Sequence, residues 1–268
     1  MGHQRLGDIP KTRRWNAVVE KATGGGNASA GAVNLSVDVP LIAAETLAAA
    51  DAGLNLAVND QGLKFTFYLL TQIVLSAREQ DWQAGLSEIG IRLSADSSVF
   101  DLTSEVQRTI DEYVRRHGRA TTISEMAQQS AGEAIASLAN NEAVTLFGNG
   151  REELQEAVRQ LSTKAGFAKL GQKFFGCLMA RFLNFYISRV AASQVGGSRI
   201  PDMANLTEFN EALRTHCQQS AKIVHDFCGE WYSKTEFQKG IDLDNTSGFM
   251  AIAVRKLQAE LRKQREAV

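Results

Sequence analysis

Proline, cysteine and long apolar runs are all scarce in this chain of 268 residues, and each shortage excludes a class of protein. No window reaches the roughly 18 consecutive apolar residues of a membrane-spanning helix, because Arg181 and Arg189 interrupt the most apolar stretch, residues 174–190. The first residues lack the apolar core of a secretory signal. The three cysteines are an odd number, which favours reduced thiols over a disulfide framework. We therefore expect a cytoplasmic protein with no membrane partner.

Signals for β-strands are also nearly absent, whereas apolar residues recur at the spacing of an α-helix. Only three prolines interrupt the chain, and 160 residues separate Pro40 from Pro201. A capping box formed by Thr122 and Glu125 predicts one helix start. We expect an all-α protein, a multi-helix bundle of about eight helices. Their expected ranges are 40–54, 62–79, 97–117, 122–139, 150–162, 164–194, 205–236 and 246–266.

The N-terminal segment differs in composition from the rest of the chain. A short basic helix is expected around residues 13–20, and a stretch rich in Gly, Ala, Ser and Asn follows at 21–36. We therefore expect residues 1–36 to form a flexible basic arm. Residues 37–268 are expected to form one helical domain, with a candidate hinge at 195–201, where two glycines precede a proline.

Charge is the one uneven property of this sequence, whose formal net charge is −1. Residues 157–201 hold seven basic residues and no Asp or Glu, whereas residues 101–156 hold five basic and ten acidic residues. Along a helix over 164–194 the cations are expected to form one row beside a separate apolar stripe. The seven cations are Arg159, Lys164, Lys169, Lys173, Arg181, Arg189 and Arg199.

Three interpretations of this basic segment remain open. The cations are neutralised inside the fold by the acidic residues of 101–156, where exposed pairs contribute roughly 0–1 kcal/mol each. Alternatively, they form a surface for an acidic protein partner, for which charge sets the association rate and the register. In the third interpretation they contact the phosphates of a nucleic acid, although the net charge and the absence of a known motif disfavour this.

Two further features predict contact surfaces. Trp231 and Tyr232 are adjacent and cannot share one narrow helix face, so one of them is expected to be exposed in a binding patch. The last helix carries an apolar seam of about two heptads over residues 250–261, which is a candidate for self-association. The predicted contact residues are Arg13, Arg14, Lys164, Lys169, Lys173, Arg181, Arg189, Arg199, Trp231 and Tyr232.

Motifs for catalysis, nucleotide binding and metal binding are missing from the sequence. The Gly-rich stretch 24–31 lacks the Gly-Lys-Ser/Thr ending of a phosphate-binding loop. His225 and Cys228 offer two metal ligands, but on one helix Cys217 would stand about 16 Å from Cys228, too far to share an ion. We predict no catalytic residue, no metal and no cofactor.

These observations favour a non-catalytic interaction or scaffold subunit of a larger cytoplasmic assembly, with at least one protein partner. Such a subunit is expected to be encoded beside its partners; an operon for defence against foreign DNA in a bacterium is one example, which no residue specifies. A nucleic-acid-binding accessory protein that uses residues 157–201 is the first alternative. A helical enzyme whose site is assembled from scattered residues, such as His216, His225 and Glu230, is the second.

Overall fold

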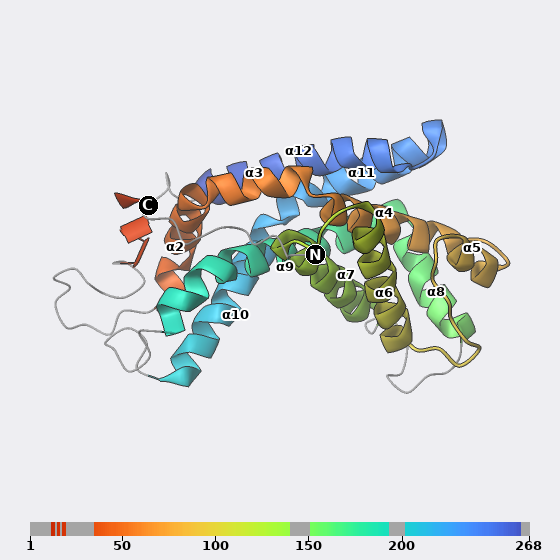
Figure 1. Cartoon of the computed structure of the whole chain (residues 1–268), viewed down its shortest axis with the longest axis horizontal. Coiled ribbons are helices and arrows are strands. Elements are labelled where there is room, and N and C mark those ends of the chain that lie inside the picture. The colour runs from red at the N-terminus through yellow and green to blue at the C-terminus, as the bar shows by residue number, and fades with distance from the viewer. Residues whose placement is uncertain are drawn as a thin grey trace.

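The computed structural model of the chain describes residues 35–139, 151–192 and 202–263, and six residues nearer the N-terminus. These six are Thr12, Arg13, Trp15, Asn16, Val18 and Val19. In the described part, eleven α-helices form the secondary structure without a β-strand (Figure 1), which confirms the all-helical prediction. The helices are α2 (Leu35–Ala49), α3 (Asp51–Asn59), α4 (Gln61–Ser76), α5 (Trp82–Glu88), α6 (Val99–His117), α7 (Thr122–Ala139), α8 (Arg151–Leu161), α9 (Lys164–Ala192), α10 (Met203–Ser220), α11 (Lys222–Lys239) and α12 (Leu243–Lys263).

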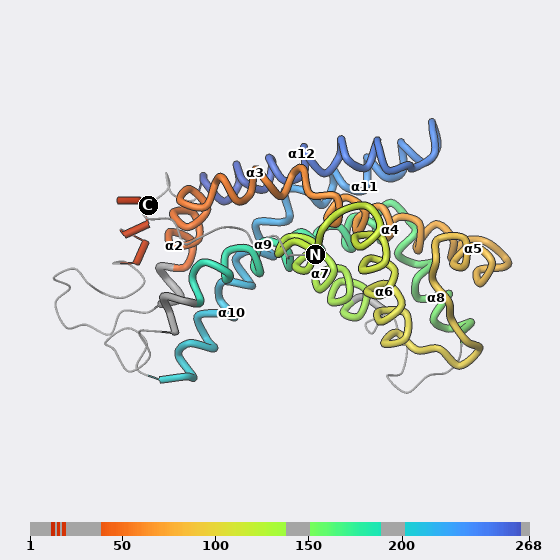
Figure 2. The backbone as a smooth tube through the Cα atoms, in the orientation of Figure 1, coloured from red at the N-terminus to blue at the C-terminus, as the bar shows by residue number. Residues whose placement is uncertain are grey.

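The expected count of about eight helices is too low by three among the described residues, and one of the three additional helices arises because a long helix is broken. Residues 205–236 are divided at Ala221 between α10 and α11, and the chain changes direction there (Figure 2). A straight helix over 203–239 would be about 55 Å long, whereas α9 measures about 44 Å. The bend keeps both α10 and α11 in contact with α9. Tertiary packing, rather than a Gly or Pro, therefore places this break.

The N-terminal helical region is divided as well. α2 continues through Pro40, and the pair Val39–Ala49 and Asp51–Asn59 is bent by 69°. The short helix α5 was not predicted at all.

No single described helix is long and apolar enough to cross a membrane. The helices α2 and α3 meet that criterion only together, as the bent pair.

The central helix of the bundle is α9, which contacts α2, α7, α8, α10 and α11. Its apolar side chains are buried on all sides, including Phe167, Phe174, Phe182 and Leu183. A helix that is apolar around its whole circumference is typical of a protein core. The structure therefore corrects the expected division of this helix into one apolar face and one basic face.

An aromatic cluster joins α9 to the helices around it. The ring of Phe67, on α4, is fully buried and lies within 5.3 to 6.1 Å of five other aromatic ring centroids. These rings come from α9, α11 and α12, so the cluster connects four helices. The five rings belong to Phe167, Phe174, Phe175, Trp231 and Phe249.

Part of the expected N-terminal arm belongs to the core. Trp15 and Val18 are buried, and the Trp15 ring packs edge-on against Tyr186 at 6.3 Å. Trp15 therefore anchors this segment to α9. Apart from the six described residues, residues 1–34 lie outside the described part of the chain, as does the candidate hinge at 195–201.

The start of α7 is capped one residue earlier than predicted. The backbone N–H of Ser124 donates to Thr121 Oγ1 at 2.8 Å, and the N–H of Thr121 donates to Ser124 Oγ at 2.9 Å. The reciprocal pair is therefore Thr121 with Ser124, not Thr122 with Glu125. The Thr121 hydroxyl oxygen accepts the bond from Ser124, and the hydroxyl hydrogen donates to Asp60, the N-cap residue of α4.

We expect Phe67→Ala to lower the free energy of unfolding by about 3–5 kcal/mol, because it removes the ring at the centre of the aromatic cluster. Denaturant unfolding followed by circular dichroism measures this change. Phe237→Ala is the matched control: Phe237 is 91% exposed, and its loss should change stability by less than about 0.5 kcal/mol. Equal effects of the two substitutions would contradict the packing described here.

Candidate functional site

Glu133, on α7, ion-pairs with three cations from two neighbouring helices. Its Oε2 lies 2.8 Å from Nη1 of Arg181, and its Oε1 lies 3.9 Å from Nζ of Lys173. Arg214, on α10, also pairs with this carboxylate. The cluster therefore ties α7 to α9 and α10, as expected if residues 101–156 neutralise the basic segment. One carboxylate cannot balance three cations, however, so the cluster keeps a positive charge.

Two hollows of about 270 and 320 Å³ open beside this cluster, and Arg214 lines both of them. Glu133 and Arg181 line the first hollow, and Lys173 and Lys222 line the second. We call this surface, formed by these four cations and Glu133, the basic groove. No other carboxylate lines either hollow in the described part of the chain.

Amide side chains fix the floor of the basic groove. Nε2 of Gln218 donates to the carbonyl of Lys173 at 3.3 Å, and Gln172 donates to the carbonyl of Gln218 at 3.2 Å. Gly176 permits this close approach, because a Cβ at that position would lie 2.5 Å from the Gln218 side chain. Among the described residues, the buried Oδ1 of Asn184 in the first hollow has no hydrogen-bond donor. The groove thus offers charged and polar groups in fixed positions.

The other cations of the basic segment lie apart from the groove or outside the described residues. Arg159 pairs with Glu156 within α8, and Lys164 lies 3.8 Å from Glu230 on α11. Lys169 is exposed, with no ion pair to any described residue. Arg13 is exposed as well. The description does not include Arg14, Arg199 and the side chain of Arg189.

The predicted aromatic patch is corrected by the structure. Tyr232 is fully buried: its ring stacks on Phe167 at 4.1 Å, and its hydroxyl accepts a hydrogen bond from Arg78 at 3.2 Å. Trp231 is half-buried and stacks on Phe249 at 4.3 Å. The exposed aromatic residue near this segment is Phe237, which the sequence analysis did not select.

Other helices of the same chain cover the apolar seam of the last helix. Its four members are buried where α12 contacts α2, α4 and α11. Self-association through this seam would have to displace those contacts. The members are Met250, Val254, Leu257 and Leu261.

The scattered residues of the enzyme alternative do not meet at a common site. His216 is buried on α10, and burial lowers its pKa. His225 forms a hydrogen bond with the side chain of its neighbour Asp226, and Glu230 is exposed on α11. None of these residues lines any of the hollows described here. Within the described ranges, no group of three or more His, Cys, Asp or Glu side chains is arranged to hold a metal ion.

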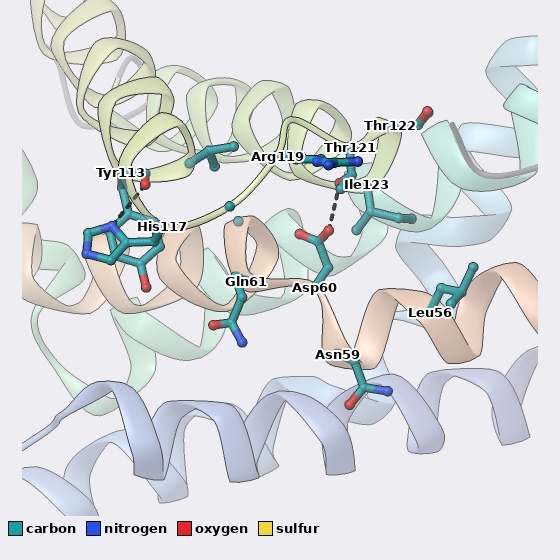
Figure 3. A pocket seen from close by; sticks show the side chains of 13 residues that line it. Leu56, Asn59, Asp60, Gln61, Tyr113, His117, Arg119, Thr121, Thr122 and Ile123 are labelled. Carbon is teal, nitrogen blue, oxygen red and sulfur yellow. Dashed lines mark hydrogen bonds between the residues drawn. The ribbon is translucent and has the colours of Figure 1, made fainter. Parts of the chain in front are cut away.

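A third hollow, of about 270 Å³, lies where the α3–α4 junction meets the loop between α6 and α7 (Figure 3). We call it the junction pocket. Asp60 fixes its floor, since Oδ1 accepts from the N–H of Leu63 at 2.7 Å and Oδ2 accepts from the hydroxyl of Thr121 at 2.6 Å. At one end Tyr113 is stacked between Phe65, at 3.7 Å, and His117, at 4.3 Å. No motif in the sequence predicts this pocket.

Comparison with known proteins adds no function to this geometry. No family model, curated protein or solved structure matches the chain. The function must therefore be inferred from the basic groove and the junction pocket themselves.

Glu133→Gln should lower the free energy of unfolding by about 1–3 kcal/mol, because the three cations around this half-buried carboxylate would repel one another without it. Added salt should recover part of the loss by screening that repulsion. Denaturant unfolding at low and high ionic strength measures both effects. Glu112→Gln on α6 is the control: Glu112 pairs with Arg108 at a more exposed site, so we expect a change below about 1 kcal/mol. An equal, salt-independent change in both variants would contradict the role of Glu133.

The three cysteines should resist a thiol reagent in the folded protein. Cys177, Cys217 and Cys228 are buried, and burial raises the pKa of each thiol, which suppresses the reactive thiolate. Ellman's reagent at about pH 8 should detect no fast-reacting thiol before denaturation and three afterwards. Rapid labelling that maps to Cys177 would contradict its burial beneath the first hollow.

Proposed function

We propose that this protein is a non-catalytic interaction subunit of a larger assembly and that its basic groove binds an acidic segment of a protein partner. The observation that carries this proposal is the charge of the groove, where, among the described residues, four cations face a single carboxylate. Charge complementarity of this kind raises the association rate and fixes the register of a partner.

The four cations of the groove differ in how far their side chains are exposed to a ligand. Lys173 and Arg181 are half-buried and already oriented by Glu133. Arg214 and Lys222 are more exposed, and they lie on α10 and at the start of α11. A partner carboxylate would therefore meet Arg214 and Lys222 first, and the planar guanidinium of Arg214 can donate two parallel hydrogen bonds to it.

Neighbouring amides favour an extended peptide as the acidic ligand. Gln172, Gln218 and Gln219 line the second hollow beside the cations. The amide nitrogens of Gln172 and Gln218 already donate within the fold, so the exposed amide of Gln219 is the one that donates most readily to a ligand. A side-chain amide both donates and accepts hydrogen bonds, as does a peptide backbone. The groove thus supplies cations for acidic side chains and amides for the main chain between them. The nucleic-acid alternative would use the same cations, so its test has to be made on the same variants.

A fluorescently labelled, Glu-rich peptide should bind the full chain at low salt, and the double variant Arg214→Glu, Lys222→Glu should weaken that binding by about tenfold or more. The reversed charges repel the peptide carboxylates. Fluorescence polarisation measures the affinity. The matched control reverses two exposed cations of α6, Arg115→Glu and Arg116→Glu, and should leave the affinity within about twofold of the unsubstituted chain.

Labelled duplex and single-stranded DNA should be titrated beside the peptide at about 50 and 200 mM salt. The proposal expects the peptide to bind more tightly than either DNA. Tighter DNA binding that the groove variant removes, and that falls linearly in log salt, would replace the proposal with the nucleic-acid alternative. Peptide binding that both variants weaken equally would contradict a specific groove.

A further inference from the structure

The junction pocket has a preformed shape. Gly62 lets the start of α4 lie directly against the start of α7, since a Cβ there would stand 2.3 Å from Cβ of Ser124. The hydrogen bond from Thr121 to Asp60 joins the same two helix starts. A pocket whose walls are held by such contacts needs little rearrangement to receive a ligand, which favours binding.

The two ends of the pocket differ in character. Figure 3 shows Leu56 at one end, and Tyr113 with His117 at the other. Leu56 is 55% exposed although it borders a hollow that Val114 and Ile123 also line. Large apolar side chains beside a concave surface provide the area that an apolar ligand would cover.

Arg119 places a guanidinium in the pocket wall. It lies in the loop between α6 and α7, and no described carboxylate forms an ion pair with it. Among the described residues, Asp60 is the one carboxylate that lines the pocket, and both of its oxygens accept hydrogen bonds from the fold. The guanidinium of Arg119 is therefore free to donate two hydrogen bonds to a ligand carboxylate.

The aromatic wall restricts how a ligand can approach. Phe65 and His117 cover the two faces of the Tyr113 ring, so only its edge and its hydroxyl are open. Ring edges carry partial positive charge and attract the face of another aromatic ring. A cavity of about 270 Å³ is slightly smaller than the roughly 300–1,000 Å³ of pockets for drug-sized ligands. A ligand of one or two fused rings suits both observations.

We propose that the junction pocket binds a small aromatic carboxylate, with its carboxylate group on Arg119 and its ring between Leu56 and the edge of Tyr113. This site is separate from the basic groove. Its ligand is a small molecule, and its residues come from α3, α4, α6, α7 and the loops between them.

Titration of the full chain with 2-naphthoate, followed by isothermal calorimetry, tests this proposal. We expect saturable binding with a Kd below about 1 mM, and a loss of about tenfold in Arg119→Gln, which keeps hydrogen-bond donors but removes the charge. The neutral analogue 2-naphthamide should bind more weakly than 2-naphthoate and should respond little to this substitution. Leu56→Glu, at an exposed position that should not affect folding, should weaken 2-naphthoate through repulsion.

Two control variants separate this site from other cations. Arg116→Gln removes an exposed charge of α6 that does not line the pocket, and Arg214→Glu alters the basic groove. Both should leave 2-naphthoate binding unchanged. The proposal is overturned by the absence of saturation up to about 5 mM, by equal weakening in Arg119→Gln and Arg116→Gln, by loss of binding in Arg214→Glu alone, or by equal affinity for the amide and the acid.

Discussion

The central position of α9 limits which residues that helix can carry. Five helices pack around it, so most of its side chains have no path to water. A short acidic side chain on such a helix would bury its charge, whereas the long apolar stems of Lys and Arg can carry a charge to the edge of the core. Lys173 and Arg181 do this, since both are half-buried and reach Glu133 on α7. Packing therefore disfavours acidic residues at the buried and half-buried positions of α9.

The same constraint produces the basic groove. Because α9 cannot neutralise its own cations, it uses the carboxylate of a neighbouring helix, and Glu133 is shared with Arg214 of α10. The excess positive charge then lies where α9 and α10 meet, beside Lys222. Holding α7, α9 and α10 together and presenting a positive surface are therefore two consequences of one arrangement of charge.

Local periodicity was enough to predict the helical class, because most helices of this chain bury apolar residues at helical spacing. It could not predict the break at Ala221, which depends on the lengths of α9, α10 and α11 in space. It also could not identify the burial of Tyr232, since an adjacent pair such as Trp231 and Tyr232 is covered from two sides when two other helices flank α11.

The sites differ in how much the sequence revealed about them. The acid-free segment pointed to Lys173 and Arg181. The sequence did not single out Arg214 and Lys222. Glu211 and Asp226 lie near them in sequence, so the net charge of that stretch of the chain is close to zero. Those two carboxylates do not line the groove, so only the fold separates them from the cations. No local sequence pattern predicts the junction pocket, because two turns about sixty residues apart in the sequence form it together.

One helix contributes to both sites. The first turn of α7 forms a wall of the junction pocket, and Glu133, about 15 Å further along the same helix, orients the cations of the groove. The start of α7 is fixed to α4 through Thr121 and Asp60, and its later turns are fixed to α9 and α10 through Glu133. The two sites therefore share α7, which is held at its start by α4 and further along by α9 and α10.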